Sequence, residues 1–201
     1  MSTRMRWRLI SRNFPLAMGH SGIILCLIIV STVSLEGCGM QESEEAASLR
    51  AAAEQGDAEA QYKLGVAYAN GEGVAQNDEE AVQWTRMAAE QGFAQAQHNL
   101  GAAYRYGLGV AQDYEEAVQW FLAAAEQGNA SAQNNVGVMY ADGRGVRQDY
   151  EEAYAWIGTA AAQGYSGTTE TLQALREEMT PSQVESAVEL AREYREKYVT
   201  H

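Results

Sequence analysis

Apolar and small residues recur along this chain at helical spacing, in a pattern that repeats every 36 residues. An alanine, a glutamine, a leucine or valine, a glycine and a tyrosine fall at i, i+1, i+4, i+5 and i+8, which places them along one face of a helix. We call this set of five residues the stripe of the helix. The three copies are Ala60, Gln61, Leu64, Gly65 and Tyr68; Ala96, Gln97, Leu100, Gly101 and Tyr104; and Ala132, Gln133, Val136, Gly137 and Tyr140. A glycine inside a helix costs about 1 kcal/mol relative to alanine, so its recurrence predicts a close approach of a neighbouring helix.

A Gly-x-Gly-Val turn follows each stripe and leads into a second helix. The first glycine can end the helix in the left-handed conformation, and the second permits the chain to reverse. Next, Asn77, Asp113 and Asp149 each stand three residues before a glutamate, a spacing that predicts helix N-caps. The expected buried faces of the second helices are Ala81, Trp84 and Ala88; Ala117, Trp120 and Ala124; and Ala153, Trp156 and Ala160. We therefore expect the tryptophans to belong to the core.

A unit of 36 residues cannot bury its own apolar face, so consecutive units must stack. The pattern predicts an all-α fold, an α/α solenoid of helix-turn-helix repeats with an extended surface. The expected organisation is a signal segment at 1–37, a tether at 38–41, a capping helix at 42–56, repeats at 57–92, 93–128 and 129–164, and capping helices at 165–201.

The last helix is expected to start at Thr180, with Pro181 at its first position and Gln183 completing a capping box. Glu193 and Lys197 are spaced to pair on its exposed side. The expected packing face consists of Val184, Ala187, Val188, Ala191, Tyr194 and Tyr198. This helix would close the stack.

The first forty residues have the order of a secretory signal, with four arginines followed by an apolar run and then Leu35-Glu36-Gly37-Cys38. The last four residues resemble a bacterial lipoprotein box, which implies that the Cys38 thiol receives diacylglycerol and that Cys38 becomes the first residue. Glu36 departs from the small residue usual at its position. An uncleaved anchor over 14–35 remains the alternative, since about 20 apolar residues cross a bilayer.

Both alternatives place the repeats outside the cytoplasmic membrane, facing the periplasm, with the arginines left inside. Gly39 resembles the residue that follows the cysteine in lipoproteins sent to an outer membrane, which favours the outer over the inner membrane. If Cys38 is the mature start, Cys26 leaves with the signal and no disulfide is available. We expect stacking alone to hold the fold.

The full pattern, A-x-x-x-L-G-x-x-Y-x-x-G-x-G-V followed by E-A-x-x-W-x-x-x-A-A-x-x-G, resembles the Sel1-like repeat family over 60–164. The tetratricopeptide family is a near relative, but its repeat is shorter and lacks the G-x-G-V turn. The resemblance implies an α/α superhelix that acts as a scaffold or adaptor for protein complexes. In related solenoids the first helix of each repeat lines the concave side.

The charge disfavours two classes of partner. The net charge is −13, and from Cys38 onward 26 acidic residues face 10 basic ones. An acidic surface disfavours nucleic acid and anionic lipid. The expected partners are other envelope proteins or peptide segments, with the membrane reached through the lipid anchor.

The sequence offers no evident catalytic, metal or cofactor site. The G-x-G turns do not extend to G-x-G-x-x-G, and the paired glutamates after each cap suit the first turn of a helix. His98 is the only histidine between the signal and His201, and the motifs G-x-S-x-G, S-x-x-K and H-E-x-x-H are absent. We expect that the protein is not an enzyme and that it binds no cofactor or metal.

Two alternatives remain open. A cysteine-rich branch of the Sel1-like family is linked to β-lactam binding and hydrolysis, but it relies on a cysteine pair in each repeat, which this chain lacks. Recognition of cell-wall or exported polysaccharide fits family members that serve polysaccharide export, because tyrosines could stack on sugars.

Candidate binding residues are those that differ between copies while their neighbours are constant, on the side of the first helices opposite the stripe. Tyr106 is the expected aromatic anchor. The alternative for each position is drift on a solvated surface. The candidates for partner binding are Tyr62, Lys63, His98, Asn99, Tyr106, Asn134, Asn135 and Asp142.

Overall fold

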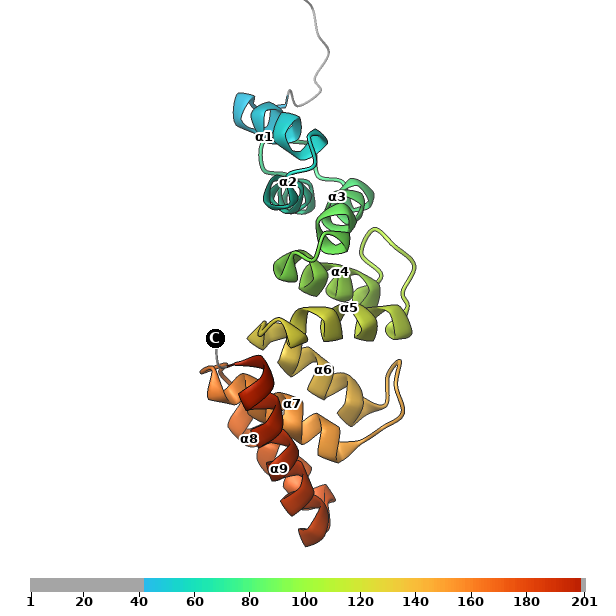
Figure 1. The fold of residues 1–201 in the computed structure, drawn as a ribbon. Coiled ribbons are helices and arrows are strands. Elements are labelled where there is room, and N and C mark those ends of the chain that lie inside the picture. Colours follow the sequence, from blue (N-terminus) through green and yellow to red (C-terminus); the bar gives the residue numbers. More distant parts are fainter. Residues whose placement is uncertain (1–41, 200–201) are drawn as a thin grey trace, which may run out of the picture. The chain divides into compact units, whose positions relative to one another are not determined.

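The structure, a computed structural model, describes residues 42–199 (Figure 1). The expected signal segment, the tether and Cys38 lie outside the described residues. The elements are α1 (Glu44–Glu54), α2 (Ala58–Asn70), α3 (Asp78–Glu90), α4 (Ala94–Tyr106), α5 (Tyr114–Glu126), α6 (Ala130–Asp142), α7 (Tyr150–Ala162), α8 (Thr168–Glu178) and α9 (Pro181–Tyr198). Every element within 42–199 is a helix, which confirms the predicted all-α class.

Helices α1 to α7 form a stack in which each helix packs against the next one in sequence. The pairs α2 with α3, α4 with α5 and α6 with α7 are the two helices of one repeat. The pairs α1 with α2, α3 with α4 and α5 with α6 join one repeat to the next. The arrangement is the predicted α/α solenoid.

The predicted caps start the second helix of each repeat. The side chain of Asn77 accepts hydrogen bonds from the backbone N–H groups of Glu79 and Glu80, at 3.0 and 3.2 Å. Asp113 and Asp149 do the same in the next two repeats. The N–H of each capping residue donates to the carbonyl of the tyrosine that closes the preceding stripe, so the cap also ties the two helices together.

The stripe glycines lie at close helix crossings, as predicted. A Cβ atom built at Gly65 would lie 2.5 Å from Thr85 Oγ1, and one at Gly137 would lie 2.5 Å from Ile157 Cγ1. At Gly101 the nearest atom is Cδ1 of Phe121, at 2.8 Å. The residue facing each glycine is therefore the one that follows the tryptophan.

The expectation that all three tryptophans are core residues was wrong for two of them. Trp84 and Trp120 are only partly buried, whereas Phe121 is fully buried, because the position after the tryptophan faces the glycine of the first helix. Trp156 is 3% exposed because α9 covers it. In the central repeat, the main core aromatic is Phe121.

The second glycine of each turn has a role beyond the reversal. Gly109 has φ +65°, and a Cβ atom there would collide with the backbone carbonyl of Asp78 at the start of α3. Gly145 (φ +72°) stands in the same relation to the carbonyl of Tyr114 at the start of α5. The turn of one repeat thus packs against the helix start of the repeat before it.

A chain of glutamine hydrogen bonds runs through the stack. Gln133 is fully buried, and its side-chain amide donates to the carbonyl of Ala125 in the preceding repeat, at 3.1 Å. Its Oε1 accepts from Nε2 of Gln163, which ends the second helix of its own repeat, at 2.7 Å. The same two bonds recur at Gln61 and at Gln97. The glutamine of the stripe therefore satisfies backbone and side-chain groups between consecutive second helices.

Replacing Gln133 with leucine is expected to lower the free energy of unfolding by about 2 kcal/mol, because the Ala125 carbonyl loses its side-chain donor in a buried place. Gln163 is exposed and can turn to water. Chemical denaturation of the two purified proteins measures the difference. A loss equal to that of Gln119→Leu, at an exposed position of α5, would contradict a structural role for the buried amide.

Helix α9 covers the third repeat. It begins with the predicted capping box, in which Thr180 accepts from the N–H of Gln183 and the Gln183 side chain accepts from the N–H of Thr180. The ring of Trp156 lies 4.5 Å from that of Tyr194 and 5.4 Å from that of Tyr198, between ring centroids. The face expected for this helix is correct for both tyrosines, for Ala187 and Ala191, which are buried, and for Val184, which packs against the core; Val188 is 42% exposed.

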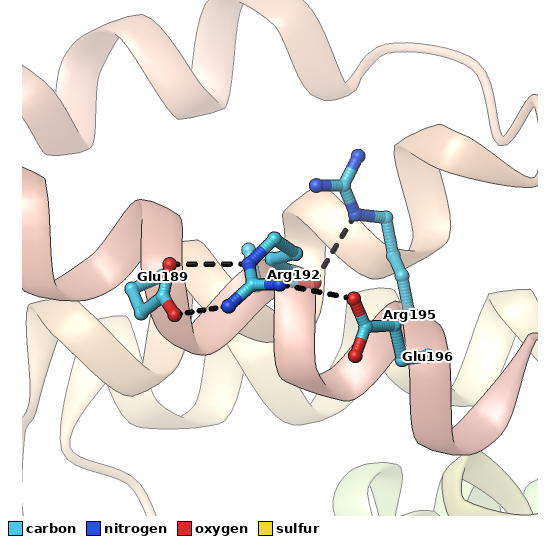
Figure 2. A network of polar contacts seen from close by, with 5 residues as sticks. Glu189, Arg192, Arg195 and Glu196 are labelled. Atoms are coloured by element: carbon cyan, nitrogen blue, oxygen red, sulfur yellow. Dashed lines mark hydrogen bonds and ion pairs between the residues drawn. The ribbon is translucent and has the colours of Figure 1, made fainter.

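An arginine network occupies part of the outer side of α9 (Figure 2). Arg192 pairs with Glu189 and with Glu196, and Arg195 donates to the carbonyl of Ala191. Lys197, which was expected to pair with Glu193, lies with its Nζ 4.7 Å from the ring centroid of Tyr198. Exposed pairs of this kind contribute little to stability, so the tyrosines and not the charges hold α9 in place.

Candidate functional site

The candidate residues all lie on α2, α4 and α6, the first helices of the three repeats. We call the surface that they share the first-helix face. Tyr62 and Lys63 lie on α2, His98, Asn99 and Tyr106 on α4, and Asn134, Asn135 and Asp142 on α6. The structure brings His98, Asn99 and Asn135 into one hydrogen-bonded group and leaves the others apart from it.

The group around His98 joins the second repeat to the third. His98 Nε2 lies 3.1 Å from Asn135 Nδ2, and His98 Nδ1 lies 3.2 Å from Asn99 Oδ1. Asn135 Nδ2 can only donate and Asn99 Oδ1 can only accept, so these assignments fit a neutral ring with its proton on Nδ1. Arg105 completes the group by donating to Asn135 Oδ1, at 3.0 Å.

Arg105 was missed at the sequence level. The positions in register with it are Ala69 and Ala141, so the difference between copies was visible. Three of the candidates, together with Arg105, thus hold repeats together.

Burial lowers the pKa of His98, and the hydrogen bond to Asn99 opposes that shift. A histidine whose pKa is lowered by folding binds its proton more readily in the unfolded chain. Its contribution to stability is therefore retained above the ordinary pKa of about 6.5 and lost as the pH falls below it.

We expect the wild-type protein to lose more thermal stability than His98→Asn when the pH is lowered from about 7.5 to about 5.5. Asparagine is the residue in register at Asn134, so the substitution suits the helix. Thermal unfolding followed by circular dichroism at both pH values measures the two losses. Parallel losses in the two proteins would show that His98 is not the group that titrates.

Tyr106 is the most exposed large apolar residue of this face, at 61%, and Leu108 follows two residues later, at 53%. The guanidinium of Arg105 lies 5.2 Å from the ring centroid of Tyr106 and orients it. The residues in register with Leu108 are Glu72 and Arg144, so only the central turn carries an apolar side chain there. The sequence does not predict Leu108 as a binding residue, because the G-x-G-V pattern indicates only a turn.

Several other candidates are engaged within the fold. The ring of Tyr62 lies 5.2 Å from that of Phe93, between centroids. Lys63 pairs with Glu59 at 2.6 Å, and Asp142 pairs with Arg144 at 3.5 Å, both on the exposed surface. Asn134 is partly buried on α6. Tyr62, Lys63 and Asp142 thus each have a partner within the fold.

Two further findings concern residues 42–199. Within this range, no three side chains of histidine, cysteine, aspartate or glutamate are grouped so that they could hold a metal ion. None of the helices in the same range combines the length and the apolar character needed to cross a bilayer.

The comparisons with known proteins agree with this geometry. The profile of the Sel1 repeat matches residues 58–93, 94–129 and 130–165, more than half of the chain. The chain therefore belongs to the Sel1 repeat family. A comparison with curated proteins gives no match.

Two solved structures are similar to the described fold. The crystal structure of a Sel1 repeat protein from Oxalobacter formigenes is 40% identical, with a TM-score of 0.60, and the match covers 66% of this chain and 99% of that one. The crystal structure of c5321, a protective antigen of uropathogenic Escherichia coli with an SLR fold, is 33% identical, with a TM-score of 0.59. That match covers 76% of this chain but only 41% of c5321.

Proposed function

We propose that this chain is a membrane-anchored, periplasm-facing scaffold that binds other envelope proteins through its first-helix face. Membership of the Sel1 repeat family supports a role in protein–protein interaction. The envelope setting rests on the signal-like arginines, the apolar run and Leu35-Glu36-Gly37-Cys38. The proposal assigns the chain no catalytic step, cofactor or metal.

The observation that carries the binding role is the exposure of Tyr106 and Leu108 at the end of α4. Tyrosine is prominent among the residues that supply most of the binding energy of protein interfaces, and the core of an interface is more apolar than its rim. The third repeat has Asp142 and Arg144 in the same two positions, paired with each other. The central repeat therefore presents an apolar contact where its neighbour presents a closed ion pair.

Cross-linked envelope preparations offer the test. We expect tagged wild-type protein to retain a set of envelope proteins that Tyr106→Ala loses. Val188→Ala is the matched control, because Val188 is also exposed but lies on α9. Identical partner sets for Tyr106→Ala and wild type would contradict the assignment of the surface, and an empty set for wild type would contradict the scaffold role.

The anchor is tested separately by mass spectrometry of the amino terminus. A diacylglyceryl group on Cys38 is the expected result, and Cys38→Ser should release the repeats from the membrane fraction or leave the signal uncleaved. A mature terminus that retains the segment 14–35 would replace the lipid anchor with the alternative of a membrane-spanning signal anchor. Purified protein is expected to leave the β-lactam nitrocefin unhydrolysed.

A further inference from the structure

A cleft of about 470 Å³ opens between the first repeat and the first helix of the second, bounded by α2, α3 and α4. Its walls are mainly apolar, with Val66 and Ala69 on α2, Val82 on α3 and the exposed Leu108 at one edge. Its volume lies within the range of pockets that hold ligands or inserted side chains. The cleft is therefore large enough to take part of a binding partner.

We call the space between the first helices of two consecutive repeats an interval: α2 and α4 bound the first interval, and α4 and α6 bound the next. The cleft exists because two positions that carry large side chains in the next interval carry small ones in the first. Thr85 lines the cleft, whereas the residue in register between α4 and α6 is Phe121, which is fully buried. Ala69 also lines it, where the next repeat has Arg105. In the next interval Phe121 packs against the ring of His98, at 5.7 Å between centroids.

The two intervals are bridged by different charged side chains: in this one Arg86 on α3 donates to the hydroxyl of Tyr104 on α4, whereas two other arginines bridge the next. Arg105 reaches across to Asn135, and the guanidinium of Arg144 lies 5.7 Å from the ring centroid of Tyr114. In the first interval, Leu108 stands in register with Arg144, and Asp78 stands in register with Tyr114. The backbone of the turn at Gly109 packs against Asp78, but a leucine cannot pair with a carboxylate, so the side chains of Leu108 and Asp78 form no ion pair at this edge.

The edge of the cleft carries an acidic side chain, Asp78, in the first turn of α3. Asp78 lines the cleft at the start of α3, and the ion pairs found within residues 42–199 do not include it. The surroundings have the same sign, since residues 42–128 contain 15 acidic and 4 basic residues. A bound cation beside the apolar walls would gain electrostatic attraction, and an anionic segment would be repelled.

We propose that this cleft receives one aliphatic side chain from a basic segment of a partner protein, with a lysine or arginine of that segment paired to Asp78. The inference deepens the proposed scaffold function and rests on it. The aliphatic side chain lies against Val66, Val82 and Leu108. Apolar burial provides the affinity, and the carboxylate selects basic over acidic segments.

Immobilised synthetic peptides test the chemistry directly. The probes are short peptides with a central leucine between lysine pairs, the same peptide with a central serine, and the leucine peptide with glutamate pairs. Purified protein is expected to bind the leucine–lysine peptide about tenfold more tightly than either of the others. Equal binding of the serine and leucine peptides would overturn the proposal.

Three variants locate the binding. Thr85→Phe fills the cleft with the residue used by the next repeat, Asp78→Asn removes the charge while keeping the size, and Leu108→Arg places the residue of the third repeat at the edge. Each is expected to weaken binding of the leucine–lysine peptide about tenfold, while Val188→Ala binds like wild type. Leu108→Arg keeps the test decisive if Thr85→Phe does not fold, because Leu108 is exposed. Unchanged binding by Leu108→Arg and Asp78→Asn would overturn the proposal.

The same variants separate this inference from the scaffold function. If Thr85→Phe and Leu108→Arg keep the envelope partners of wild type while Tyr106→Ala loses them, the first-helix face is a binding surface and the cleft is not its anchor. If the partners are lost with all three, the cleft is part of the surface. If wild type captures no partner, the scaffold function itself fails.

Discussion

Replacing Phe121 with alanine is expected to lower the free energy of unfolding by about 3 to 5 kcal/mol, the largest effect of any single substitution considered for this chain. Phe121 is fully buried at the crossing of α4 and α5. Its ring packs against Gly101, in the place that a side chain at this position would occupy. It also lies against the ring of His98, which joins the second repeat to the third. The substitution therefore leaves a cavity in the centre of the stack.

Urea denaturation of Phe121→Ala and Trp120→Ala distinguishes the two neighbours. Trp120 is the larger residue, but it is only partly buried, so its loss should cost clearly less than that of Phe121. A sequence argument from residue size and from recurrence gives the opposite order. A larger effect of Trp120→Ala would mean that the tryptophan, not the phenylalanine, fills the core of the central repeat.

Gly137→Ala is expected to cost about 3 kcal/mol, at the upper end of the usual range for overpacking. A Cβ atom at this position would lie 2.5 Å from Ile157 Cγ1 and 2.8 Å from the carbonyl oxygen of Ala153. The isoleucine can adjust its side chain, but the carbonyl belongs to the backbone of α7. Helices α6 and α7 must therefore move apart to admit the methyl group.

Gly158→Ala is the matched control within the same repeat. Its Cβ atom would meet only the Cβ atom of Ala191, at 3.4 Å, an ordinary contact. Since alanine favours a helix by about 1 kcal/mol over glycine, this substitution should be neutral or stabilising. Thermal unfolding of both variants measures the contrast, and equal effects would show that the α6–α7 crossing is not tightly packed.

The regular part of the fold could be predicted from the sequence because its causes are local and recur in register. Asn77, Asp113 and Asp149 cap helices through side chains that reach their own next turn. The stripe glycines predicted close helix crossings, because glycine destabilises a helix and its recurrence at one position therefore indicates a packing requirement. Gly71 confirms the expected left-handed end of the first helix, with φ at 72°.

The position of α9 could not be predicted, because it depends on a residue of the second repeat that differs from its counterparts and lies far from α9 in sequence. In the first two repeats an arginine of the preceding second helix donates to the hydroxyl of the stripe tyrosine, as Arg86 does to Tyr104 at 2.7 Å. The third copy has Leu122 instead, which packs with the aromatic cluster that includes Tyr194. An apolar residue at this one position leaves a surface that α9 covers.

Comparison of the copies gave candidate binding residues, and their role in binding stays a prediction. It singled out Tyr106, the most exposed apolar residue of the first-helix face. It did not distinguish exposed side chains from those, such as His98 and Asn135, that form hydrogen bonds between one repeat and the next. That distinction depends on which atoms meet across the interval, which a single sequence does not contain.

The glutamine chain has a consequence for how proteins of this kind change length. Each buried amide connects to the repeat before it and to the end of its own repeat, in the same way at Gln61, Gln97 and Gln133. When one whole 36-residue unit is duplicated or deleted, each glutamine donor meets an acceptor equivalent to its former one. Recombination can therefore alter the number of repeats without leaving a glutamine unpaired between two of them. An insertion of any other length within a helix would leave a polar amide facing an apolar neighbour, and selection would remove it.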